Sequence, residues 1–151
     1  MPPTSSDTPA THSEGRWDKA LPENIDQTVH DFIGARNLNR GVWYIETCPQ
    51  IYRFLLIEKL VLFAIESTAA DVQLVCDLFS LPSMDKLCPP DCLEMAFTLV
   101  SERIDDLALD SPEAYKRIVI MIKRVHLDRD VERLARIVMK SRQRERFVTL
   151  F

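Results

Sequence analysis

The sequence has only three glycines, Gly15, Gly34 and Gly41. Loops that cradle phosphate groups and sharp turns that present a nucleophile depend on glycine, because its backbone reaches positive φ and permits close approach. The scarcity of glycine therefore argues against both kinds of site.

Long hydrophobic runs are also missing. The longest falls well short of the roughly 18 apolar residues that a membrane-spanning helix needs. Residues 1–15 are polar and rich in Pro, Ser and Thr, unlike a secretory leader. We therefore expect no membrane segment, a cytoplasmic location, and a disordered polar leader over residues 1–21.

Metal-ligand spacing is absent among the four cysteines, Cys48, Cys76, Cys88 and Cys92. Cys88 and Cys92 are placed to meet across a helix start, but no further Cys or His completes a familiar zinc set. Thiols stay reduced in the cytosol by default. We expect four packing thiols, no metal site and no cofactor.

Catalytic constellations are equally hard to find. None of the three histidines, His12, His30 and His126, has a Cys or Ser in a recognisable nucleophile context. Carboxylate pairs that act as acid and base need a pocket that separates their pKa values. The sequence therefore predicts a protein that is not an enzyme.

What the chain does contain is an uneven distribution of charge around a net charge of -4. Residues 26–125 hold 15 acidic and 10 basic side chains, whereas residues 126–151 hold 4 acidic and 7 basic ones. An acidic body disfavours broad binding to a phosphate backbone, which needs a basic surface. It suits a partner with a basic face.

Apolar side chains recur with helical periodicity along the whole of residues 22–151, and no stretch shows sustained alternation with a period of two. Residues 51–67 are apolar on nearly every side, which is typical of a helix buried between neighbours. We expect one all-α domain of about seven helices, stacked as antiparallel hairpins. Expected caps are Asn24 for the first helix and the Asp91/Glu94 capping box for the fifth.

The most informative stretch is residues 104–115, which interleaves acids with leucines and breaks at Ser111-Pro112. Pro112 suits the first turn of a helix, and Asp110 or Ser111 is placed to cap it. Asp106 and Asp110 are four residues apart on the predicted connection between two helices, so in a helical turn they point the same way. We expect an acidic surface at this joint.

Two simpler interpretations of these acids compete with a binding role. Exposed acids near helix starts are common as caps and solvated charges, each contributing a fraction of a kcal/mol. A magnesium site would need carboxylates that converge with a substrate phosphate, and the chain offers nothing else that binds phosphate. The first interpretation stays open, and the second is disfavoured.

The acid at 106, Asp at 110 and Pro at 112 form a spacing that resembles the signature of the MI domain, also called the MA-three domain. The segments 28–32 and 36–38 resemble the opening helical hairpin of that family, and 60–79 resembles its central helix pair. The end of the chain after His126 is similar to fungal-type copies in the C-terminal region of the translation scaffold factor 4-gamma. The resemblance extends over most of the chain.

The resemblance implies a HEAT-like right-handed α-solenoid and a role in translation initiation or its regulation. It implies a scaffold or inhibitor module that binds the DEAD-box RNA helicase through the acidic joint. Matched position by position, Asp106 and Asp110 fall on the acids that contact the helicase. Asp105, Pro112 and Tyr115 fall beside them as orienting or supporting residues. We expect a monomer.

Two features leave alternatives open. Many family members carry an aromatic-His pair before the third helix, where this chain has Ile51-Tyr52-Arg53, so the packing or contacts there are in question. The basic run 140–146 is interpreted as charge at the end of the final helix, with weak RNA contact as the alternative, and Phe147 and Phe151 as folding back on the body. The runner-up function is an adaptor of the same fold for another RNA-processing or translation partner, or a stand-alone competitive inhibitor of the helicase.

Overall fold

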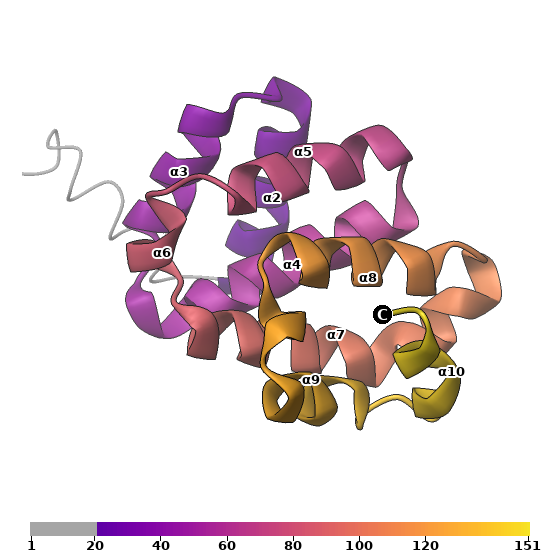
Figure 1. The fold of residues 1–151 in the computed structure, drawn as a ribbon. Helices are drawn as coiled ribbons and strands as arrows, with labels where there is room; N and C mark the ends of the chain where they lie inside the picture. Colours follow the sequence, from indigo (N-terminus) through magenta and orange to yellow (C-terminus); the bar gives the residue numbers. More distant parts are fainter. Residues whose placement is uncertain (1–20) are drawn as a thin grey trace, which may run out of the picture.

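The computed structural model describes residues 21–151, and the structural statements below concern this part of the chain. Every regular element in it is helical (Figure 1), which confirms the predicted all-α class. Its nine α-helices and two 3-10 helices are, in order, α2 (Leu21–Ala35), α3 (Leu38–Thr47), η2 (Gln50–Tyr52), α4 (Arg53–Glu66), α5 (Ala69–Phe79), α6 (Met84–Leu87), α7 (Pro90–Asp110), α8 (Ala114–Arg124), η3 (Leu127–Arg129), α9 (Val131–Val138) and α10 (Arg144–Thr149).

The count of about seven helices was too low by two α-helices for residues 21–151. The predicted seven correspond to α2, α3, α4, α5, α7, α8 and α9, and the two that were not predicted are α6 and α10. These two span four and six residues. Segments this short do not complete enough turns for apolar periodicity to reveal them. The predicted disordered leader lies outside the described residues, except that Leu21 begins α2.

Two predicted caps were wrong. α2 begins at Leu21 with Pro22 in its first turn, so Asn24 lies inside the helix. α7 begins at Pro90 after Pro89, and no side chain caps its start. A proline at the first helical position has no N–H to satisfy, so the start of α7 needs one cap fewer.

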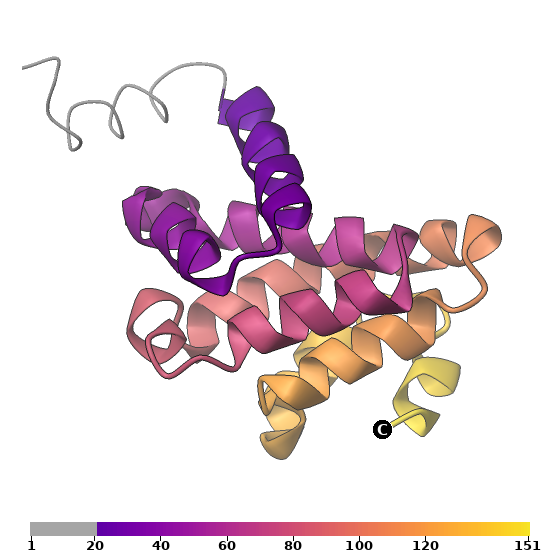
Figure 2. The ribbon, with the colours of Figure 1, turned by 90° about the horizontal axis from the view of Figure 1, so that it is seen from above.

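Helix α4 forms the centre of the molecule, packed against α2, α5, α7 and α8 (Figure 2). Ile57, Val61, Ala64 and Ile65 on this helix are fully buried, as its nearly all-round apolar pattern predicted. The Arg117 side chain on α8 donates to backbone oxygens at the end of α4, at 2.8 Å and 2.7 Å. The start of α8, which follows the end of α7, is thereby fixed against the end of α4.

Close packing of α2, α3 and α5 requires a glycine at position 41. A Cβ atom there would lie 2.6 Å from Phe32 and 2.9 Å from Leu78. Both neighbours are fully or almost fully buried and have no room to move. Gly41 is therefore needed for close approach and not for positive φ.

The Tyr52-Arg53 position, where the sequence left the packing in question, holds a structural arginine. Arg53 donates to the backbone oxygens of Cys48 at 3.1 Å, Leu87 at 3.0 Å and Glu46 at 3.0 Å. It thus satisfies carbonyls at the ends of both α3 and α6, which lack further helical partners.

Three of the four cysteines, Cys48, Cys88 and Cys92, lie near Arg53. Cys48, Cys76 and Cys88 are buried and Cys92 is half-buried, and all four are free thiols. The Sγ atoms of Cys88 and Cys92 are 2.6 Å apart, as their spacing across a helix start predicted. Burial raises the pKa of Cys48 to about 12, which keeps this thiol protonated and unreactive.

None of the helices between residues 21 and 151 has the combination of length and apolarity that crossing a bilayer requires.

Replacing Leu62 with Asp should unfold the domain. Leu62 is 5% exposed on the central helix α4, and an unpaired buried carboxylate costs several kcal/mol against a typical stability of about 5–15 kcal/mol. Thermal melting followed by circular dichroism measures the effect. Ile51→Asp is the matched control, because Ile51 is 70% exposed and should melt close to the parent. A Leu62→Asp protein with the parent melting temperature would show that α4 is not the centre of the core.

Candidate protein-binding site

The acidic residues singled out in the sequence lie at the end of α7 and not on a connection between helices. α7 continues to Asp110, so Asp106 and Asp110 belong to its last turns. The predicted connection at these positions was wrong because Leu107 and Ala108 extend the helical pattern to the break at Ser111-Pro112. Four residues apart on a helix, the two carboxylates share one face, as predicted.

The turn that follows also differs from the prediction. α8 begins at Ala114, two residues after Pro112, and no side chain caps it. The Ala114 N–H donates instead to the backbone oxygen of Ser111 at 2.9 Å. Neither Asp110 nor Ser111 therefore caps α8 with its side chain. The Asp110 carboxylate is not used as a helix cap.

We call Asp106, Asp110 and Glu113 the acidic edge. All three side chains are exposed, Asp106 by 77%, and Glu113 has only a surface ion pair to Lys116 at 3.7 Å. Such exposed pairs are weak because water screens them. The acidic edge therefore keeps its negative potential available to a partner.

Asp105 has the opposite environment from its neighbour Asp106. Its side chain is 11% exposed and lies under the acidic edge. It accepts hydrogen bonds from the hydroxyl of Tyr115, from Ser141 Oγ at 2.8 Å and from the Arg142 backbone N–H at 2.7 Å. We call these four residues the Asp105 network. It joins α7, α8 and the segment that precedes α10.

The pKa values of Asp105 and Tyr115 indicate the protonation states of these two groups at neutral pH. Burial acts to raise the pKa of Asp105, but the hydrogen bonds from Tyr115, Arg142 and Ser141 outweigh it, so the pKa lies below its usual value. Burial and the neighbouring carboxylate raise the pKa of Tyr115 to about 12. At neutral pH, Asp105 is therefore ionised and Tyr115 is a neutral donor.

Arg142, in the basic segment after α9, reaches one residue of the acidic edge, Asp106. Arg142 Nη2 is 3.3 Å from an Asp106 oxygen, and Arg142 Nε is 3.6 Å from an Asp105 oxygen. The basic run 140–146 was interpreted from its sequence as charge at the end of the final helix. That interpretation was incomplete, because the run connects α9 to a further helix, α10. Sequence reasoning missed Ser141 and Arg142 as members of the site, since nothing in their spacing points to α7.

Phe147 anchors the same segment to the body, as the folding-back of the terminal aromatics predicted. It is fully buried, and its ring centroid lies 5.7 Å from that of Tyr115 and 5.8 Å from that of Phe151. Arg146 lies over the Tyr115 ring at 5.8 Å. Tyr115 therefore supports the acidic edge through its hydroxyl and the end of the chain through its ring.

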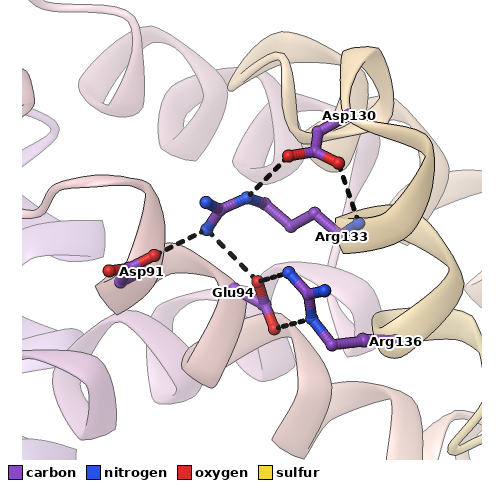
Figure 3. Close-up of polar contacts among 5 residues, drawn as sticks. All are labelled: Asp91, Glu94, Asp130, Arg133 and Arg136. Atoms are coloured by element: carbon purple, nitrogen blue, oxygen red, sulfur yellow. Dashed lines mark hydrogen bonds and ion pairs between the residues drawn. The ribbon is translucent and has the colours of Figure 1, made fainter.

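A second acidic group on α7 has a structural use (Figure 3). Glu94 accepts two hydrogen bonds from Arg136, at 2.9 Å and 3.0 Å, and Arg133 lies 3.0 Å from Asp91 and 3.2 Å from Glu94. Asp130 caps α9 through the Arg133 N–H. The hydrogen bonds from Arg136 lower the pKa of Glu94. Asp91 and Glu94, which were predicted as a capping box, instead fasten α9 to α7.

The last turns of α7 thus differ from its first turns in one respect. Asp91 and Glu94 are paired by two arginines of α9, whereas Asp106 is met only by the largely exposed Arg142 and the acidic edge stays accessible.

No group of three or more His, Cys, Asp or Glu side chains in residues 21–151 is arranged to hold a metal ion.

Replacing Asp105 with Asn should destabilise the protein and loosen the segment around Arg142. A carboxylate with three donors becomes an amide that satisfies fewer of them, which costs about 1–3 kcal/mol. Because the folded-state pKa is lowered, this stability is present above the ordinary value of 3.8 and is lost as the pH falls through the folded pKa. The penalty of Asp105→Asn in denaturant unfolding should therefore stay constant from neutral pH down to about 3.8 and shrink only as the pH falls further.

Asp106→Asn, one residue along, is the control and should change stability by less than about 1 kcal/mol. Hydrogen exchange at the Arg142 amide reports the same contact directly. Unchanged protection of that amide in Asp105→Asn would contradict the network.

Scanning this chain against protein-family models, curated proteins and solved structures gave no match.

Proposed function

We propose that the chain is a protein-interaction module of translation initiation that binds the DEAD-box RNA helicase through the acidic edge. The observation that carries the proposal is the pair Asp106 and Asp110. Both are exposed on one face at the end of the longest helix, and neither is needed to cap a helix. Their spacing to Pro112 is the one for which the sequence resembles the MI domain.

The chemistry of the acidic edge fits a basic protein surface. Hydrogen bonds from arginine to carboxylates are charge-assisted and stronger than neutral ones, and complementary potentials raise the association rate. A partner arginine would replace Arg142 on Asp106. Because both side chains of that ion pair are 77% exposed, displacing it costs at most about 1 kcal/mol.

The remaining residues of the site have supporting roles in this proposal. Asp105 and Tyr115 hold the end of α7 against α8, so that Asp106 and Asp110 are presented by a fixed backbone. Pro112 disfavours a helical conformation at Ser111, which ends α7 one turn after Asp106. A rigid support matters because a binding site loses affinity when ordering it consumes free energy.

The proposed architecture is a HEAT-like right-handed α-solenoid, in a cytoplasmic protein. It is supported by the packing of successive helices on one another, α2 with α3, α4 with α5, α7 with α8, and α9 with α10. Stacked helical pairs of this kind bury each face against the next pair. Direct RNA binding through the basic segment is a weaker candidate, because Arg142 and Arg146 already contact Asp106 and Tyr115.

Asp106→Lys and Asp110→Lys should each weaken binding to the purified helicase, with helical content unchanged. Each substitution replaces attraction with repulsion, and the loss of a close interfacial charge pair costs roughly 2–5 kcal/mol. Titration calorimetry measures binding, and circular dichroism measures folding. Asp106 is on the outer face of α7, so its reversal should matter little for stability.

Glu46→Lys is the matched control. Glu46 is an exposed acid near the end of α3, on the side of the first turn of α7 and outside the acidic edge, and its reversal makes the same change in net charge. The control should bind like the parent. Equal affinities of parent, Asp106→Lys and Asp110→Lys would remove the acidic edge from the mechanism. Equal weakening by Asp106→Lys, Asp110→Lys and Glu46→Lys would show that the loss of affinity reflects net charge alone.

A further inference from the structure

A second surface, unrelated to the acidic edge, lies between α9 and α10. A hollow of about 700 Å³ opens there, lined by Ala135, Val138, Met139, Arg144, Glu145 and Val148. We call it the α9–α10 groove. Met139 is 56% and Val148 46% exposed, unusually high for large apolar side chains that lie on either side of one hollow.

Both walls of the groove are held in place from behind. On α9, Arg133 and Arg136 are fastened to Glu94 of α7 (Figure 3), and Ile137 is fully buried. On α10, Phe147 is fully buried and its ring meets that of Tyr115 edge to face. The residues next to these anchors, Val138 and Val148, face the hollow. The groove is therefore a formed surface whose apolar floor has no covering element within residues 21–151.

The rim of the groove carries two basic groups and one acidic group. Arg144 and Glu145 line the groove, and Lys140 follows Met139 directly. Lys140 and Arg144 are exposed, and no ion pair joins either of them to an acid in the described part of the chain. Of residues 140–146, four are basic and only Glu145 is acidic. An apolar floor with a basic rim complements an apolar stripe flanked by acids.

We infer that the α9–α10 groove binds an amphipathic helix of a partner protein whose apolar stripe is flanked by Asp or Glu. α9 spans eight residues, or about 12 Å, which matches two turns of a partner helix with anchors at i, i+4 and i+7. The apolar anchors cover Met139, Val148 and Val138, and the partner's acids meet Lys140 and Arg144. This interaction does not depend on the proposed helicase binding.

The test uses the full chain and a fluorescein-labelled synthetic helix of about 18 residues, with leucines at i, i+3, i+4 and i+7 and glutamates on both flanks. A twin peptide carries lysine in place of every glutamate. Fluorescence anisotropy should show micromolar binding of the acidic peptide and at least about tenfold weaker binding of its basic twin. The methyl signal of Met139 should shift on titration, and that of the buried Met84 should not.

Val148→Glu and Arg144→Glu should each weaken binding of the acidic peptide by at least about tenfold. Ile51→Glu is the control, because Ile51 is an exposed apolar residue beside α3 and α4, and it should bind like the parent. Circular dichroism confirms that the variants fold. Failure of the acidic peptide to bind, equal affinity for the two peptides, or equal loss in Ile51→Glu would overturn the proposal. Self-association of the chain that Val148→Glu abolishes would also overturn it, by identifying a second copy as the occupant.

Discussion

Packing of α7 along the central helix α4 is the constraint on which the rest of the structure depends. Ala96, Phe97, Val100 and Ile104 of α7 are fully buried, and α4 contributes an equally buried face. α7 has 21 residues and α4 has 14, so at 1.5 Å per residue α7 is longer by about 10 Å. After Ile104 no residue of α7 is fully buried: Leu107 and Ala108 are only partly buried against the core, and Asp105, Asp106 and Asp110 are the polar residues of the site.

The different environments of Asp105 and Asp106 follow from this arrangement. Successive residues of a helix point about 100° apart, so Asp105 turns toward α8 and the end of the chain while Asp106 turns to solvent. The first is satisfied by Tyr115, Ser141 and Arg142, and the second keeps a weak surface pair. One carboxylate fixes the end of α7, and its neighbour remains available for binding.

Much of this fold could be predicted from the sequence, because apolar periodicity determines which face of a long helix is buried. The all-round apolar pattern of residues 51–67 identified α4 correctly. Local cap signals were less reliable: Asn24, Asp91 and Asp110 each have a side chain suited to capping, but the helices begin or end elsewhere. The sequence patterns alone do not include the tertiary packing that decides such boundaries.

The candidate site could also be predicted only in part, because sequence patterns do not include tertiary packing. Asp106, Asp110 and Pro112 are close in sequence, so their spacing reveals a shared helical face. Ser141 and Arg142 are more than 30 residues away from Asp105, and their contact depends on how α9 and α10 return to α7. The groove between α9 and α10 depends on that return as well, and α10 is too short for its pattern to be recognised.

We propose that the end of α7 is the surface through which this chain meets the helicase. The most direct test is nuclear magnetic resonance of the isotopically labelled chain during titration with the unlabelled helicase. Amide signals around Asp106 and Asp110 should change first, followed by that of Arg142, which has to leave Asp106. Saturable binding with changes confined to other helices, or no change at all, would contradict it.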